Sequence, residues 1–265
     1  MNKLNETNHT FALCAYKESP YLEACIRSIK EQTVKTNLII CTSTPSEFIS
    51  NIAGKYQISV MVREGKSDIQ EDWNFGYNLA DTDLVTIAHQ DDLYHQDYVK
   101  ILMNMYRKYP DMSMFISDYL PIKNNIIGKR DMNSRIKHIL RFPLRFTKVA
   151  HITFIKKSIL ALGNTICCPT CTYNKKMLGA TIFTSDLKFS LDWDTFLKLA
   201  LREGRFLYAD QPLVFYRIHD EATSKAFILD NRRVAEDEIM FNKFWPKAVT
   251  KLIMVFYKKA YDTYN

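Results

Sequence analysis

Apolar runs and stretches of helical periodicity alternate along the first half of the chain. Five runs have the length and composition of buried strands, and they cover residues 10–16, 37–41, 58–62, 84–88 and 112–119. Helical spacing or helix-start residues mark the stretches between them, at residues 20–32, 46–53, 68–80 and 97–109. In the first of these, Ser19 is expected to cap the helix and Pro20 to occupy its first turn. This alternation predicts an α/β fold with a parallel sheet.

The second half of the chain is less regular. Its expected elements are a helix ending at Gly163, a strand over 170–174, a helix over 191–203, an extended stretch over 205–219, and helices over 223–244 and 246–261. Neither an internal repeat nor a long flexible linker separates them. We therefore predict a mostly parallel, Rossmann-like central sheet that is flanked by helices and followed by C-terminal helices.

The composition is that of a protein with a large core. Of 265 residues, 47% are hydrophobic, which excludes disordered and fibrous classes. No run reaches the roughly 18 consecutive apolar residues of a membrane span, and the polar residues 1–7 lack the apolar core of a signal peptide, so we expect a cytoplasmic protein. The six cysteines are scattered, which favours reduced thiols. Cys168 and Cys171 have the spacing of a redox pair or half a zinc site, but they stand alone, and we expect buried thiols there.

Positive charge is concentrated in residues 129–157. The chain has a net charge of +7, and this segment holds nine Lys or Arg against one acid, Asp131. Basic residues such as Arg135 and Lys137 alternate there with apolar ones such as Ile136 and Ile139. Two interpretations stay open. The segment lies on an anionic membrane surface or contacts phosphates, or it is a solvated helix whose apolar side packs on the core.

The strand expected over 84–88 is followed by His89 and by two adjacent acids, Asp91 and Asp92. In open α/β sheets ligands bind beyond the carboxyl ends of the strands, and adjacent carboxylates there commonly hold a hard cation against phosphate oxygens. The pattern indicates nucleotide chemistry. A plain turn is the alternative, because Asp is common where strands end.

Four stretches in a fixed order carry a family resemblance: residues 15–33 (AYKESPYLEACIRSIKEQT), 73–80 (WNFGYNLA), 89–92 (HQDD), and 191–194 (LDWD) with 216–219 (YRIH). Together they resemble the family-2-type inverting nucleotide-sugar glycosyltransferases, which have the GT-A fold. The resemblance runs from about residue 10 to residue 224. It implies a nucleotide-sugar-binding half over 1–119, an acceptor-binding and catalytic half over 120–222, and C-terminal helices over 223–265.

The resemblance also implies a divalent cation, Mn²⁺ or Mg²⁺, beside the donor diphosphate. Such a cation neutralises charge on the leaving group as the sugar departs. The resemblance places Asp91 at the second acid of the metal-binding motif and His219 at the later residue that approaches the metal or diphosphate. Asp92 and His89 are further candidate ligands. His89 replaces the first acid of the family motif, and imidazole suits Mn²⁺ better than Mg²⁺. A structural role is the alternative for each histidine.

Sugar transfer also needs a base that takes the proton of the acceptor hydroxyl as its oxygen attacks the anomeric carbon. Asp192 matches the catalytic Asp of the family, at the start of a helix whose packing face would contain Trp193, Phe196, Leu197 and Ala200. Helix capping is the alternative role for Asp192, and Asp194 is its nearest competitor.

The resemblance implies a donor pocket lined by Tyr16, Glu18, Thr42, Asp68, Trp73, Asn74, Asp91 and Arg217. Thr42 and Ser43 stand where the family often has acids that read the base, which is compatible with uracil and hence with a UDP-sugar. Alternation along a strand would put Arg217 and His219 on one face, where both contact the diphosphate. The alternative for Arg217 is a salt bridge to Asp210 or Glu221.

We therefore expect a metal-dependent inverting glycosyltransferase of polysaccharide biosynthesis that moves a sugar to a saccharide or lipid-linked hydroxyl, in the cytoplasm or peripheral at a membrane. One alternative is a non-catalytic sugar- or nucleotide-binding homologue, which His89 suggests. Another is a nucleotidyltransferase, which should have a Gly-rich phosphate loop near its first strand, although the first glycine here is Gly54. Nucleic acid is not an expected partner, because the chain lacks a recognition motif and its excess charge is confined to one segment.

Overall fold

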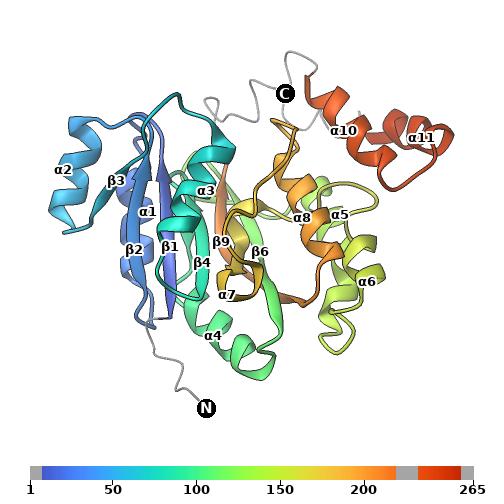
Figure 1. The fold of residues 1–265 in the computed structure, drawn as a ribbon, viewed down its shortest axis with the longest axis horizontal. Helices are drawn as coiled ribbons and strands as arrows, with labels where there is room; N and C mark the ends of the chain where they lie inside the picture. Colours follow the sequence, from blue (N-terminus) through green and yellow to red (C-terminus); the bar gives the residue numbers. More distant parts are fainter. Residues whose placement is uncertain (1–7, 219–231, 258–265) are drawn as a thin grey trace.

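The computed structural model describes residues 8–218 and 232–257. Its centre is a nine-stranded sheet in the order β3-β2-β1-β4-β8-β6-β9-β5, with β7 paired to β6 (Figure 1). The strands are β1 (His9–Ala15), β2 (Asn37–Thr42), β3 (Val60–Val62), β4 (Leu84–His89), β5 (Leu93–Tyr94), β6 (Met112–Lys123), β7 (Ile126–Ile127), β8 (Cys171–Asn174) and β9 (Arg205–Arg217).

Parallel pairing joins β3, β2, β1 and β4, and it joins β6 to β9. Antiparallel pairing links β8 to both β4 and β6, and it adds β5 to β9 and β7 to β6. Because β8 bridges the two parallel parts, the first and second halves of the chain share one sheet. The predicted α/β class, with a central sheet flanked by helices, is confirmed.

Helices cover both faces of the sheet (Figure 1). They are α1 (Leu22–Lys30), α2 (Glu47–Lys55), α3 (Ile69–Leu79), α4 (Tyr98–Lys108), α5 (Met132–Leu140), α6 (Thr153–Ser158), α7 (Lys175–Leu178), α8 (Leu191–Leu201), α10 (Arg232–Asn242) and α11 (Lys247–Tyr257), with 3₁₀ turns η1 (Phe142–Arg145) and η2 (Cys168–Thr170). The regular part of α1 begins later than predicted, with Tyr21 as its N-cap, but the Ser19 hydroxyl oxygen does accept a hydrogen bond from the Tyr21 N–H at 3.3 Å, as a capping residue would.

Two cores lie on opposite faces of the sheet. Phe11 and Leu13 of β1 point into the core that α1, α2 and α4 cover, whereas Ala12 points into the core covered by α3, α8, α10 and α11. Such alternation is the side-chain period of a strand. The predicted packing face of α8 is confirmed, since Trp193 and Phe196 are fully buried in the second core.

Gly76 allows α3 to approach the sheet closely. A Cβ atom at this position would lie 3.2 Å from the Cβ of Ala12 and 3.4 Å from the sulfur of Cys41. The first distance is tighter than most van der Waals contacts and the second is at their lower limit, so a larger side chain would require α3 or its neighbours to move. Gly76 therefore allows α3 to pack closely on β1 and β2.

The basic segment forms α5, η1 and α6, and its apolar residues divide between the core and the surface. Leu144 and Ala150 are fully buried in the core, whereas Met132, Ile136 and Ile139 of α5 are exposed. The interpretation in which the apolar side packs on the core therefore holds for residues after α5 and not for α5 itself. Within the described part of the chain, no helix combines the length and the apolar character that crossing a membrane requires.

Candidate active site

The acidic turn, residues 89–92, follows β4 and is tied to the end of β1. Gln90 makes this link, because its Oε1 accepts a hydrogen bond from the Tyr16 N–H at 3.0 Å and its Nε2 donates to the Tyr16 carbonyl oxygen at 2.8 Å. The Asp92 N–H closes the turn by donating to the His89 carbonyl oxygen at 3.3 Å. The carboxyl ends of β1 and β4 thus meet at the edge of the sheet where α/β proteins bind ligands.

The two acids of the turn differ in their surroundings. Asp92 is 2% exposed, and its Oδ1 accepts a hydrogen bond from the backbone N–H of Arg217 at 2.8 Å. Burial raises the pKa of Asp92 to about 8, so its carboxyl group is largely protonated at neutral pH. Asp91 is partly exposed, and its Oδ1 accepts a hydrogen bond from the Ser19 hydroxyl at 2.7 Å. Asp91 is therefore the acid of the turn that a cation can reach.

Arg217, the last residue of β9, joins the acidic turn from the other side. Its Nε donates to the carbonyl oxygen of Asp91 at 2.8 Å, and its guanidinium group lies 4.1 Å from the centroid of the Tyr21 ring. A second guanidinium nitrogen donates to Oδ1 of Asn125 at 2.7 Å. The structure places Arg217 against the backbone of Asp91, where it is 7% exposed.

The alternative role predicted for Arg217 was a salt bridge to Asp210 or Glu221. Asp210 pairs with Arg145 at 2.7 Å, and no ion pair with Arg217 is found among the described residues. Glu221 and His219 lie outside the described residues, so the predicted approach of His219 to the metal stays a prediction.

His89 has the chemistry of a metal ligand. Its Nε2 is buried and has no hydrogen-bond partner among the described residues, and burial lowers the pKa of His89 to about 4, so the ring is neutral at neutral pH. The Trp73 ring stacks on it with centroids 5.1 Å apart. A neutral imidazole with an unused nitrogen, two residues before an accessible carboxylate, fits a divalent cation such as Mn²⁺.

The predicted nucleotide side of the site is a polar rim around the ends of β2 and β3. Thr42 is buried, and its Oγ1 accepts a hydrogen bond from the Thr44 N–H at 3.0 Å. Asp72 links the segments that follow β2 and β3, because it accepts hydrogen bonds from Ser43 at 2.8 Å and from Arg63 at 2.7 Å. Asp72 was not predicted from the sequence, although its place in the first turn of α3 is a usable signal.

Asp68 is placed by local structure. It caps α3 by accepting from the N–H of Gln70 at 3.0 Å, and it pairs with Lys188 at 2.7 Å. The hydrogen bond from Lys188 lowers the pKa of Asp68. A shallow pocket lies at this pair and is also lined by Lys66, Ser67 and Glu71. Asp68 thus stands at a solvent-filled depression beside the rim.

Three other predicted donor residues lie on or near the acidic turn. Tyr16 is 47% exposed, and Glu18 is exposed. The Asn74 side chain is engaged with the backbone of Phe183, donating to its carbonyl oxygen at 2.7 Å and accepting from its N–H at 3.1 Å. Asn74 therefore clamps the loop before α8 onto α3, and Trp73 next to it touches the same Phe183 ring.

Asp192 stands in the first turn of α8 in a setting that suits a base. Its Oδ1 accepts a hydrogen bond from the Trp193 N–H at 2.8 Å, and its Oδ2 accepts from the Asn164 amide at 2.9 Å. Ser190 is the N-cap of α8, so Asp192 does not fill the capping role; it bonds the next N–H within the first turn, where the helix dipole favours an acid. Burial raises the pKa of Asp192 to about 6, although the nearby charges of Lys137 and Arg233 oppose the shift.

The competitor Asp194 has the opposite environment. It is 2% exposed and forms ion pairs with Lys198 at 2.8 Å and with Lys243 at 2.5 Å. Burial acts to raise the pKa of Asp194, but the hydrogen bonds from the two lysines outweigh it and the pKa is lowered. Asp194 is thus neutralised inside the fold, which leaves Asp192 as the acid available for proton transfer.

The segment around Cys167 and Cys168 lies between the acidic turn and Asp192. Burial raises the pKa of both thiols, and the charge of Asp92 adds to this for Cys167, while that of Asp192 adds to it for Cys168. Tyr94 fixes the segment to β5 by donating to the Pro169 carbonyl oxygen at 2.9 Å. The expectation of free, buried thiols is met by Cys168 and Cys171, while Cys167 is partly exposed.

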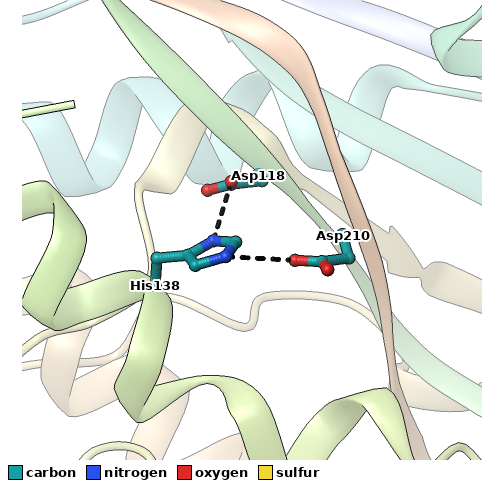
Figure 2. A group of neighbouring side chains, drawn as sticks. All are labelled: Asp118, His138 and Asp210. Carbon is teal, nitrogen blue, oxygen red and sulfur yellow. Dashed lines mark ion pairs between the residues drawn. The ribbon is translucent and has the colours of Figure 1, made fainter. Parts of the chain in front are cut away.

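A second group of acids and histidine lies at the bend of β6. His138 of α5 stands between two carboxylates, with its Nδ1 2.9 Å from Asp118 and its Nε2 3.5 Å from Asp210 (Figure 2). The three side chains could converge on a metal ion. However, the Asp118 carboxylate is already bonded by the guanidinium groups of Arg130 and Arg141. Two cations on one buried carboxylate oppose the entry of a third.

A comparison with known proteins identifies the family. Residues 10–180 match the model of glycosyl transferase family 2, and the chain belongs to that family. It is therefore an enzyme of the glycosyltransferase class, as the order of its motifs implied. No curated protein sequence matches the chain.

Solved structures of glycosyltransferases have the same fold. Staphylococcus aureus TarS 1–349 in complex with UDP-GlcNAc is 12% identical with a TM-score of 0.60, over 93% of this chain and 70% of that one. The mannosyltransferase PcManGT from Pyrobaculum calidifontis with GDP-Man and Mn²⁺ is 15% identical with a TM-score of 0.60, over 89% and 63%. Glucosyl-3-phosphoglycerate synthase from Mycobacterium tuberculosis with Mn²⁺ and UDP-glucose is 14% identical with a TM-score of 0.53, over 86% and 78%. At these identities the likeness concerns the fold, and the predicted GT-A fold is confirmed.

Proposed function

We propose that this protein transfers a sugar from a nucleoside-diphosphate donor to a hydroxyl group, with inversion at the anomeric carbon and with Asp192 as the base. The observation that carries the proposal is the contrast between two acids of one helix turn. Asp194 is neutralised by two lysines, whereas Asp192 accepts hydrogen bonds only from neutral groups among the described residues. With its pKa raised to about 6, Asp192 is ionised at neutral pH and is a stronger base than an ordinary carboxylate.

The reaction follows from these positions. Asp192 accepts the proton of the acceptor hydroxyl while the oxygen forms a bond to the anomeric carbon. The bond between that carbon and the diphosphate oxygen breaks on the opposite side, and the electron pair leaves with the nucleoside diphosphate. Arg217, held beside the acidic turn, adds positive charge close to the leaving group.

A divalent cation, Mn²⁺ or Mg²⁺, belongs to the proposal as the partner of the diphosphate. Asp91 and His89 would hold it, and His219 and Asp92 are the further candidates. When bound, the cation neutralises charge on the leaving group. The buried, unpartnered Nε2 of His89 supports this assignment, and it favours Mn²⁺ over Mg²⁺ because imidazole is the softer ligand. The Mn²⁺ in two structures of the same fold is consistent with this choice.

The donor is proposed to be a UDP-sugar. Hydroxyl groups of Thr42 and Ser43 stand at this rim in place of acids; Thr42 is buried against Thr44, and Ser43 donates to the Asp72 carboxylate. Neutral donors and acceptors suit a uracil edge. Tyr16, Glu18, Asp68 and Trp73 complete the proposed walls, whereas Asn74 is assigned an indirect role, since its amide is occupied by Phe183. The acceptor class is a saccharide or lipid-linked hydroxyl.

Release of nucleoside diphosphate from a panel of nucleotide sugars, with Mn²⁺ present, tests the proposal. UDP-sugars are expected to give the highest rate, and Asp192→Asn is expected to lower it about 10³-fold, the usual scale for loss of a base. Asp186→Asn, an exposed acid of the preceding loop, is the matched control and should keep the rate. Absence of release with every donor, while donors still bind, would instead favour the non-catalytic homologue that the replacement of an acid by His89 suggests.

A further inference from the structure

The basic segment exposes a continuous apolar stripe. Met132, Ile136 and Ile139 occur at positions i, i+4 and i+7 of α5, which places them on one face of the helix. Their exposed fractions are 69%, 49% and 67%. Helices of globular proteins bury such a stripe. Here the stripe faces solvent instead, so it has no partner within the described part of the chain.

Further exposed apolar residues occur on both sides of α5 along the chain. After α5, Phe142 and Phe146 are 48% and 57% exposed, and their rings meet edge to face with centroids 5.4 Å apart. Before α5, Ile126 and Ile127 of β7 are 71% and 49% exposed. We refer to these seven residues as the apolar strip. Exposed apolar surface of this extent marks a site of interaction with a membrane or a protein.

Polar anchors hold α5 in this orientation. On its inner side, His138 contacts Asp118 (Figure 2). Arg130 and Arg141, which lie next to the helix in the sequence, bind the same carboxylate. Asp118 is 1% exposed, so these bonds are internal. The helix is therefore anchored by its basic and histidine side chains and presents its apolar residues outward. The outward orientation of the strip is built into the fold.

The charges around the strip select its partner. Lys123, Lys129, Arg135 and Lys148 are exposed, and in residues 119–157 the single acid is Asp131. A second copy of the chain, paired about a two-fold axis, would place two such basic surfaces against each other. An anionic lipid surface, by contrast, accepts both the apolar side chains and the cations.

The strip also begins at the active site. Asn125, in the turn between β6 and β7, accepts a hydrogen bond from Arg217 at 2.7 Å, and Ile126 and Ile127 follow it directly. On the inner side of α5, the charge of Lys137 acts on the Asp192 carboxyl group. One helix and one hairpin thus connect the acidic turn, the proposed base and the outer surface.

We propose that the apolar strip and its surrounding cations dock this protein on an anionic lipid bilayer, with the active site turned toward acceptors at the bilayer surface. The partner is the bilayer itself, recognised by its negative headgroups and its apolar interior. The orientation toward a lipid-linked acceptor rests on the proposed function, whereas docking rests on the surface alone.

Co-sedimentation with vesicles tests the docking. The full chain is expected to bind vesicles that contain phosphatidylglycerol, to bind pure phosphatidylcholine at least about tenfold more weakly, and to be released by high salt. The double substitution Ile136→Glu with Ile139→Glu should lower binding about tenfold or more while thermal unfolding is unchanged, because both side chains are solvent-exposed. Lys129→Glu with Arg135→Glu should weaken binding to anionic vesicles selectively.

Matched controls come from the opposite end of the sheet. Val62→Glu alters an exposed apolar residue of β3, and Lys30→Glu reverses an exposed charge of α1; both should leave vesicle binding intact. Equal binding by the strip variants, or no binding to any vesicle, would overturn the proposal. So would a dimer in sedimentation equilibrium that the Ile136 and Ile139 substitutions abolish, since a second copy would then cover the strip. The assay contains neither donor nor acceptor, so its outcome is independent of whether the enzyme releases nucleoside diphosphate.

Discussion

Two groups in this molecule contain the same types of residue and differ in what surrounds them. The acidic turn after β4 combines His89 with Asp91 and Asp92, and the group at the bend of β6 combines His138 with two other acids. In the second group, the histidine lies between the two acids (Figure 2). Arginines already bond both carboxylates. In the first, a neutral imidazole keeps a nitrogen without a hydrogen-bond partner among the described residues.

The comparison shows that ligand-type residues are not enough to define a metal site. A buried carboxylate that is bonded by two guanidinium groups has its charge satisfied, and its role is to join segments of the chain. A carboxylate at the open edge of a parallel sheet, next to a neutral histidine, can still bind a metal ion. The surrounding charges, more than the residue types, separate a structural cluster from a catalytic one.

The largest expected effect concerns the structural cluster. Asp118→Asn removes the charge that Arg130 and Arg141 share, and it leaves those cations partly uncompensated in a buried place. The free energy of unfolding should fall by about 3–5 kcal/mol in urea titrations. Asp111→Asn, which weakens the ion pair between the 48% exposed Asp111 carboxylate and Arg205, is the control and should cost less, because water solvates that carboxylate. Similar small losses in both variants would mean that the cluster does not hold α5.

Substitution in the acidic turn should instead lower activity and leave the free energy of unfolding nearly unchanged. Asp91→Asn is expected to reduce Mn²⁺-dependent kcat/KM about 10²- to 10³-fold, because charge on the leaving group loses its main compensation. Its effect on unfolding should remain below about 1 kcal/mol, since Asp91 is partly exposed. Steady-state kinetics and urea titration on one preparation separate the two readouts. Unchanged kinetics would remove Asp91 from the metal site.

The pH profile then tests the base that works beside this turn. Burial raises the pKa of Asp192 to about 6, so the carboxyl group is protonated below that pH and cannot accept a proton. The rate should therefore fall about tenfold for each pH unit below 6 and level off above it. In Asp192→Asn the residual rate should no longer fall below pH 6. A fall that persists in the variant would assign the titration to another group.

The smallest effect is expected from exchanging the histidines for acid. His89→Asp restores a second carboxylate near Asp91 and should raise activity with Mg²⁺ relative to Mn²⁺ by roughly threefold to tenfold, as harder ligands favour the harder cation. His138→Asp, the matched change in the other cluster, should leave the ratio of Mg²⁺ to Mn²⁺ activity unchanged. An equal shift in both variants would show that the ratio reports stability and not coordination.

The sequence predicted the regular part of the fold well, because the hydrophobic period and the length of each segment distinguish strands from helices. The strands from β1 to β4 and the helices between them lie within a few residues of their predicted ranges. The two-residue strand β5 was missed, since nothing local marks so short a pairing with β9. The orientation of α5 was left open between two interpretations, because amphipathic spacing shows that a helix has two sides but does not say which side faces the core.

The candidate site was only partly predictable. The acidic turn and Asp192 follow from motif order, but the links that position them come from distant residues. Gln90 bonds the backbone of Tyr16, and Asn125 accepts a hydrogen bond from Arg217. Such pairs have no signature in one sequence, because each depends on the final register of the strands. Asp118 likewise looks like any strand acid until its arginine partners are placed.

A crystal structure with Mn²⁺ and UDP, with anomalous difference maps collected at the manganese edge, tests the central claim most directly. We expect a manganese peak within coordination distance of the Asp91 carboxylate and the His89 Nε2, in contact with the diphosphate, and no peak at the other cluster. A peak between Asp118, His138 and Asp210, with the acidic turn empty, would contradict it.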